Sequence, residues 1–123
     1  MSRKLIAVVD DLFFASKIRG AAERADVRVI FAKNLESVIE TARRERPSLV
    51  LASLHARDCD PVELANELKS DKVLSSIRLI GFFSHVDTEM QKRAVAAGFD
   101  MTLPNSSFSQ RLPEILAESL TDI

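Results

Sequence analysis

Four short apolar segments rich in β-branched residues recur along the chain, at residues 5–9, 27–31, 49–52 and 77–83. Segments 5–9, 49–52 and 77–83 are nearly continuous apolar runs, a pattern typical of central strands covered on both faces. Segment 27–31 alternates more between apolar and polar residues, which favours an edge strand. A weaker fifth segment, residues 101–103, completes a set of five predicted strands.

Between these segments the apolar residues recur with the period of a helix. The period predicts helices around residues 14–25, 35–42 and 108–116. Pro113 lies inside the last of these, and a proline cannot donate the backbone hydrogen bond that a helix interior needs. We therefore expect the last helix either to start near Pro113 or to kink there.

Residues suited to helix ends support the same division. Asn34 and Asp87 are good N-caps, and Asp60 directly precedes Pro61, which suits a first helical turn. Gly98 stands at the end of a predicted helix, where a residue with left-handed backbone conformation is favoured. Strand and helix alternate with no Pro/Gly/Ser-rich linker, which predicts one domain over residues 1–123, a doubly wound parallel α/β sheet.

The composition is that of an ordinary globular domain, with 46% hydrophobic and 28% charged residues. The net charge of −1 is too close to zero for a protein that binds nucleic acid by electrostatic attraction. No apolar run is long enough to span a membrane. Cys59 is the single cysteine, which excludes an internal disulfide and fits a reducing cytoplasm. The aromatic pairs Phe13-Phe14 and Phe82-Phe83 are interpreted as core residues.

Ligands of doubly wound sheets bind at the carboxyl ends of the strands, so the residues that follow each strand are the candidates for function. Asp10 and Asp11 follow the first strand. Two carboxylates aimed at one pocket repel each other unless a cation neutralises them, and Mg²⁺ is the natural partner for such oxygen ligands. The alternative is that Asp11 caps the following helix while Asp10 is solvated.

Several segments at matching spacings resemble the receiver domain of two-component response regulators. They are Val8-Val9-Asp10-Asp11, Leu49-Val50-Leu51-Ala52, Ser84, and Ala97-Gly98-Phe99-Asp100, and together they cover nearly the whole chain. The resemblance implies a flavodoxin-like (βα)5 fold with strand order 2-1-3-4-5. It also implies an acidic pair that holds Mg²⁺, an aspartate that accepts phosphate after the third strand, Thr or Ser after the fourth and Lys after the fifth.

The departures from that pattern decide the expected function. Ser53 stands at the position of the phosphate-accepting aspartate, and a serine hydroxyl needs a neighbouring base to become a nucleophile. Asn105 stands at the position of the lysine, which removes the charge-assisted contact to a phosphoryl oxygen. Ser84 keeps a hydroxyl at the switch position, whereas Thr102 replaces the switch aromatic. The sequence therefore resembles a degenerate receiver, or pseudo-receiver.

The remaining metal ligands follow from the same comparison. With one carboxylate lost, we expect Asp10 and Asp11 to bind Mg²⁺ only weakly, helped by the backbone carbonyl of His55. The His55 side chain is interpreted as a loop residue, because successive residues of an extended segment point in opposite directions and no third group is evident to make it a base for Ser53. His85 is interpreted as a solvent-facing residue at the border of the crevice.

These observations predict a stand-alone signal transduction module that is not an enzyme. It would bind a protein partner in trans, such as a histidine kinase, or a second copy of itself. The resemblance to receivers implies that the binding surface comprises residues 87–97, 101–103 and 108–120. One alternative is a phosphorelay receiver that uses Ser53 or a nearby aspartate as acceptor. The other is a small-ligand binder or a Mg²⁺-dependent phosphatase on the same sheet. A protein of the cytoplasm is expected, with no nucleic-acid or membrane partner.

Overall fold

The computed structural model describes residues 3–84 and 86–119, in which strands and helices alternate along the chain. The strands are β1 (Arg3–Val8), β2 (Val27–Phe31), β3 (Leu49–Ser53), β4 (Arg78–Phe83) and β5 (Met101–Pro104). The helices are α1 (Leu12–Arg24), α2 (Leu35–Glu45), α3 (Pro61–Ser70), α4 (Thr88–Ala97) and α5 (Asn105–Ser119). Every predicted strand is present, and no strand end differs from its predicted position by more than two residues.

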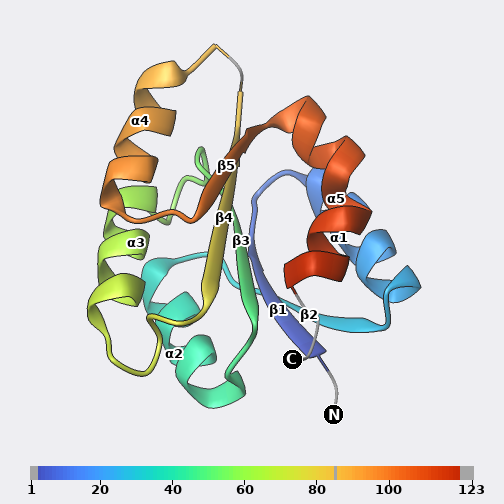
Figure 1. Ribbon diagram of the computed structural model, residues 1–123, viewed down its shortest axis with the longest axis horizontal. Helices are drawn as coiled ribbons and strands as arrows, with labels where there is room; N and C mark the ends of the chain where they lie inside the picture. Colours follow the sequence, from blue (N-terminus) through green and yellow to red (C-terminus); the bar gives the residue numbers. More distant parts are fainter. Residues whose placement is uncertain (1–2, 85, 120–123) are drawn as a thin grey trace.

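The strands form one parallel sheet in the order β2-β1-β3-β4-β5, which confirms the predicted fold. β2 lies at one edge, as its alternating pattern predicted, and β5 at the other. Figure 1 shows α1 and α5 on one face of the sheet and α2, α3 and α4 on the other. None of the helices described is long and apolar enough to cross a lipid bilayer.

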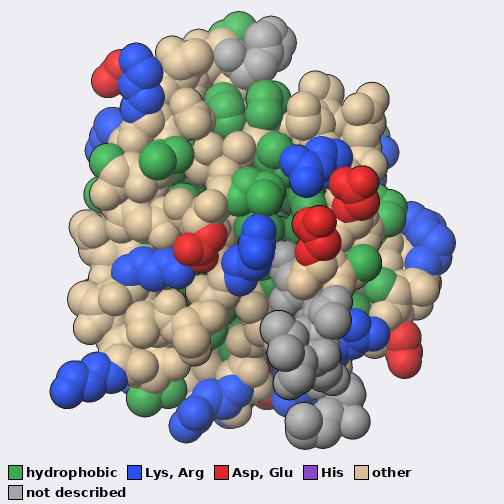
Figure 2. Space-filling model, viewed as in Figure 1, with side chains coloured by type: hydrophobic (Ala, Val, Ile, Leu, Met, Phe, Trp, Pro, Cys, Tyr) green, Lys and Arg blue, Asp and Glu red, His purple; other side chains and the backbone are tan. Residues whose placement is uncertain are grey.

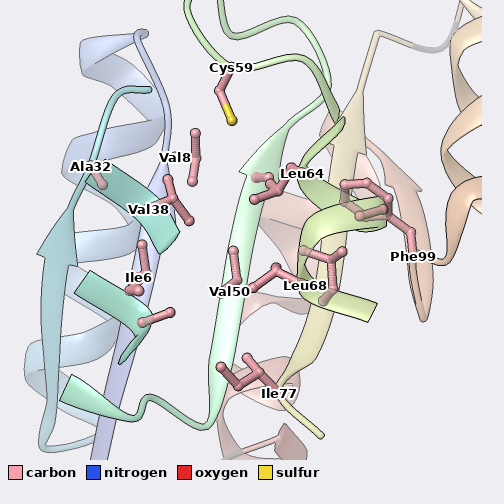
Figure 3. Packing of buried hydrophobic residues seen from close by; sticks show 14 of the residues in the cluster. Ile6, Val8, Ala32, Val38, Val50, Cys59, Leu64, Leu68, Ile77 and Phe99 are labelled. Carbon is pink, nitrogen blue, oxygen red and sulfur yellow. The ribbon is translucent and has the colours of Figure 1, made fainter. Parts of the chain in front are cut away.

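Each face of the sheet has its own hydrophobic cluster. Side chains of successive strand residues point to opposite faces, so Ile6 and Val8 of β1 belong to the cluster under α2 to α4, and Leu5 and Ala7 to the one under α1 and α5. Figure 3 shows the first cluster, where side chains from β1 and β3 meet those of α2 and α3. Burial on both faces explains the continuous apolar runs of the central strands.

Three phenylalanines join the sheet to α1 and α5. The rings of Phe82 and Phe108 stack with their centroids 4.1 Å apart, and Phe14 packs against both rings. The expectation that Phe13 is also core was wrong, because its side chain is 60% exposed. Neighbouring residues of a helix point about 100° apart, so only one of the pair faces the sheet. Phe13 instead lies under the ammonium group of Lys17.

The predicted helix ends are confirmed, with one exception. The side chains of Asn34, Asp60 and Asp87 accept hydrogen bonds from backbone N–H groups in the first turns of α2, α3 and α4. Gly98 ends α4 with a positive φ of 126°. Of the two alternatives for the last helix, a start near Pro113 was wrong, because α5 begins at Asn105 and runs through the proline. Its buried face, Phe108, Leu112, Ile115 and Leu116, packs on the sheet and offsets the missing N–H.

Candidate functional site

The predicted site residues gather where the strands end, at the upper edge of the sheet in Figure 1. Asp10 and Asp11 connect β1 to α1, and Ser53 is the last residue of β3. Ser84 directly follows β4, and Asn105 is the first residue of α5 after β5. A parallel sheet brings all these strand ends to one side, as the sequence predicted. His85 lies outside the described residues.

The two aspartates of the acidic pair have different local roles. Asp11 is the N-cap of α1, because its Oδ1 accepts hydrogen bonds from the N–H groups of Phe13 at 2.7 Å and Phe14 at 3.4 Å. Asp10 instead turns toward the β3–α3 loop, where its Oδ2 accepts a hydrogen bond of 2.8 Å from the backbone N–H of Arg57. The capping alternative thus holds for Asp11, whereas Asp10 is tied to the loop rather than simply solvated.

Arg57 is a site residue that the sequence analysis missed. Its Nε lies 3.8 Å from the Oδ2 of Asp10, so the same residue offers this carboxylate both a backbone hydrogen bond and a positive charge. The two residues are 47 positions apart. No periodicity or motif signals such a contact, because it depends on the path of an irregular loop.

Ser53 and His55 occupy the end of β3, but their side chains do not form a nucleophile and base. The Ser53 Oγ accepts a hydrogen bond from the backbone N–H of His55 at 3.2 Å. The His55 ring reaches the β4–α4 loop, where its Nε2 accepts the N–H of Ser84 at 3.1 Å and its Nδ1 lies 3.9 Å from the Oδ2 of Asp87. His55 therefore links two loops at the mouth of the site.

Thr102 and Asn105 lie at the β5 edge of the site. The Thr102 hydroxyl accepts a hydrogen bond of 3.1 Å from the side-chain amide of Gln91, so this residue of β5 is joined to α4. Gln91 is a second residue that the sequence did not single out. Asn105 is half-buried and begins α5 with an uncharged side chain.

The carboxylate oxygens of Asp10 and Asp11 are few, and a cation held by them would be bound weakly. The oxygens Oδ1 of Asp10 and Oδ2 of Asp11 accept no hydrogen bond from the described residues, so each carboxylate keeps one oxygen for a ligand. Across the described ranges there is no group of three or more Asp, Glu, His or Cys side chains that could hold a metal ion. A cation bound here would keep several of its waters, as Mg²⁺ often does.

Cys59 lies in the loop beside the site, but its thiol is buried in the hydrophobic cluster of Figure 3. Loss of solvent, together with the nearby carboxylates of Asp60 and Glu63, raises the pKa of this thiol to about 11. A thiol with such a pKa is protonated at neutral pH and unreactive. Cys59 is therefore a core residue and supplies no chemistry to the site.

Comparison with solved structures identifies the fold. The chain superposes on the phosphorylated cyanobacterial phytochrome response regulator RcpA with a TM-score of 0.85 and 19% identity, over 98% of this chain and 96% of that one. A putative response regulator from Chloroflexus aurantiacus gives 0.86 and 16%, over 98% of both chains. The receiver domain of a Pseudomonas aeruginosa sensor histidine kinase, with magnesium in its active-site cleft, gives 0.84 and 15%, also over 98% of both.

These matches show that the chain has the fold of a response regulator receiver domain. No known protein-family model matches the chain, and no curated protein matches it either.

Proposed function

We propose that this protein is a signalling module of receiver type that binds another protein and accepts no phosphoryl group at Ser53. The observation that carries the proposal is the end of β3, where a serine hydroxyl stands in place of an aspartate. The Ser53 hydroxyl accepts a hydrogen bond from the backbone N–H of His55. Among the described residues no side-chain base contacts Ser53, so nothing there would activate the hydroxyl. We propose that the domain acts by binding and does not catalyse a reaction.

The structure argues in the same way against the phosphorelay alternative. The nearby Asp60 is the N-cap of α3, where its carboxylate is engaged with backbone N–H groups. Asp58 is exposed in the loop that follows β3. A phosphoryl group on either residue would also lack a lysine partner, since Asn105 begins α5.

For the binding surface we propose the face formed by α4, β5 and α5. Figure 2 shows hydrophobic side chains along the middle of this face, between α4 and α5. Val95 of α4 is 49% exposed, and the residues of β5 from Met101 to Pro104 are all half-buried at the edge of the sheet. Such partly exposed apolar groups with charged neighbours are typical of protein-binding surfaces. Leu120, at the end of the predicted surface, lies outside the described residues.

The proposed partner is a histidine kinase or another signalling protein, or a second copy of this chain, and we place the encounter in the cytoplasm. A test compares two matched substitutions, Val95→Asp on α4 and Val73→Asp after α3, whose side chains are 49% and 48% exposed. Once a partner has been isolated with the wild-type protein, we expect Val95→Asp to weaken its binding at least tenfold and Val73→Asp to leave it unchanged. Equal effects of both substitutions would refute the assignment of the surface.

We further propose that Mg²⁺ binds weakly through Asp10 and Asp11, with the backbone carbonyl of His55 as an additional ligand. The bound ion would neutralise the acidic pair. In an NMR titration with MgCl₂ we expect shifts of the amides near Asp10 that saturate only at millimolar concentrations or above. The Asp10→Asn, Asp11→Asn variant should lose these shifts. Undiminished shifts in that variant would place the ion elsewhere.

A further inference from the structure

Arg57 places a positive charge beside the Asp10 carboxylate, at the strand ends where the predicted site residues gather. Its backbone N–H donates to the Oδ2 of Asp10 at 2.8 Å, and its Nε lies 3.8 Å from the same oxygen. The Asp10 side chain is only 25% exposed, so a nearby charge interacts with it more strongly than with a fully exposed aspartate. Arg57 is the only cationic side chain in the described ranges that forms an ion pair with this carboxylate.

The two contacts of Arg57 differ in strength. The backbone hydrogen bond belongs to the loop and does not depend on the side chain. The guanidinium itself is 88% exposed, and an ion pair as exposed as this one is weak and weakens further with salt. The side chain can therefore leave Asp10 while the loop keeps its place.

We propose that Arg57 is the built-in counter-cation of this pocket and that Mg²⁺ binds beside Asp10 only when the guanidinium moves away. Mg²⁺ and the guanidinium compete for one partly buried carboxylate and repel each other at short range. Two features would then weaken metal binding at this site. Ser53 supplies no carboxylate, and Arg57 competes with the ion for Asp10. This inference rests on the proposed weak magnesium site and is independent of the proposed protein partner.

The test is the affinity for Mg²⁺ at low ionic strength, followed by NMR on the amides near Asp10 and Asp11. Removal of one charge near a divalent ion should tighten binding about three- to tenfold in Arg57→Ala, and less in high salt. Arg57→Lys, which keeps the charge, should stay close to the wild type. Arg44→Ala is the matched control, because Arg44 forms a similar exposed ion pair with Glu40, at 3.5 Å on α2, and should not change the affinity.

The proposal would be overturned if Arg57→Ala bound Mg²⁺ no more tightly than the wild type. It would also be overturned if Arg57→Lys tightened Mg²⁺ binding as much as Arg57→Ala does. If neither wild type nor Arg57→Ala shows any shift near Asp10, both this proposal and the weak magnesium site are wrong. The proposed function would survive that result, because binding to the partner is measured separately with Val95→Asp.

Discussion

We propose that single side chains at the strand ends distinguish this site from that of a phosphate-accepting receiver. In this proposal Ser53 offers a hydroxyl in place of a carboxylate, and Asn105 offers an amide in place of an ammonium group. Arg57 adds a cation beside Asp10. The two replacements and the added cation would act in the same direction, because each lowers the attraction for either a phosphoryl group or its metal ion.

Gly81 is required by the packing beneath this pocket. A Cβ at this position would lie 2.7 Å from the Cδ2 of Leu54 and 2.9 Å from a ring carbon of Phe99. We expect Gly81→Ala to lower the free energy of unfolding by about 1–3 kcal/mol, measured by urea denaturation. Gly20→Ala on α1 is the control, since the nearest atom is a side-chain nitrogen of Arg24 at 3.6 Å. It should be neutral or stabilise the helix by up to about 1 kcal/mol. If Gly81→Ala and Gly20→Ala lowered the free energy of unfolding equally, the close packing around Gly81 would be contradicted.

The raised pKa of the Cys59 thiol gives a pH-dependent prediction. Burial shifts this pKa from 9.0 to about 11, so the folded protein keeps its thiol protonated where the unfolded chain ionises. Stability from this source is complete below pH 9 and is lost as the pH rises through about 11. Cys59→Ala should lack this component of the pH profile. Rapid alkylation of the folded wild type by iodoacetamide at pH 8 would show that the thiol is not protected.

The contact between α4 and β5 has a single polar link that can be tested. The amide of Gln91 donates to the hydroxyl of Thr102, which ties the proposed binding surface together. We expect Gln91→Ala to destabilise the protein by about 1 kcal/mol and to speed amide exchange in the last turn of α4. Gln110→Ala, an exposed glutamine of α5, serves as control. Unchanged exchange in Gln91→Ala would mean that the hydrogen bond does not hold α4 in place.

Elements could be predicted from the sequence wherever burial imposes a period. The continuous runs of β1, β3 and β4 and the N-caps Asn34, Asp60 and Asp87 were all recognisable, because local pattern decides them. Pro113 left two alternatives open, and the one in which the helix starts near it was wrong, since the apolar face of α5 outweighs one missing hydrogen bond. Tertiary packing, which no local pattern records, decides such cases.

The candidate site could be predicted only in part for a related reason. Asp10, Asp11, Ser53, Ser84 and Asn105 lie at the ends of strands or follow them, so the topology alone brings them to one edge. The links from Asp10 to Arg57 and from His55 to Ser84 could not be foreseen, because they join residues far apart in sequence through irregular backbone. The link from Gln91 of α4 to Thr102 of β5 depends on how that helix packs against the sheet edge, which no local pattern records.

For the molecule as a whole, we propose that a domain with the receiver fold accepts no phosphoryl group at the end of β3. The fold match covers 98% of the chain, so the proposed difference from a phosphate-accepting receiver concerns single residues and not the architecture. Ser53, the last residue of β3, tests this proposal more directly than any other residue, because the proposal assigns it to the acceptor position.

The most direct test is intact-mass spectrometry after incubation with a small-molecule phosphodonor and MgCl₂. We predict no phosphoryl adduct on the wild-type protein at any pH between 5 and 9, while a phosphate-accepting receiver domain treated in parallel gains one. A gain of one phosphoryl group that is lost in Ser53→Ala would contradict the account.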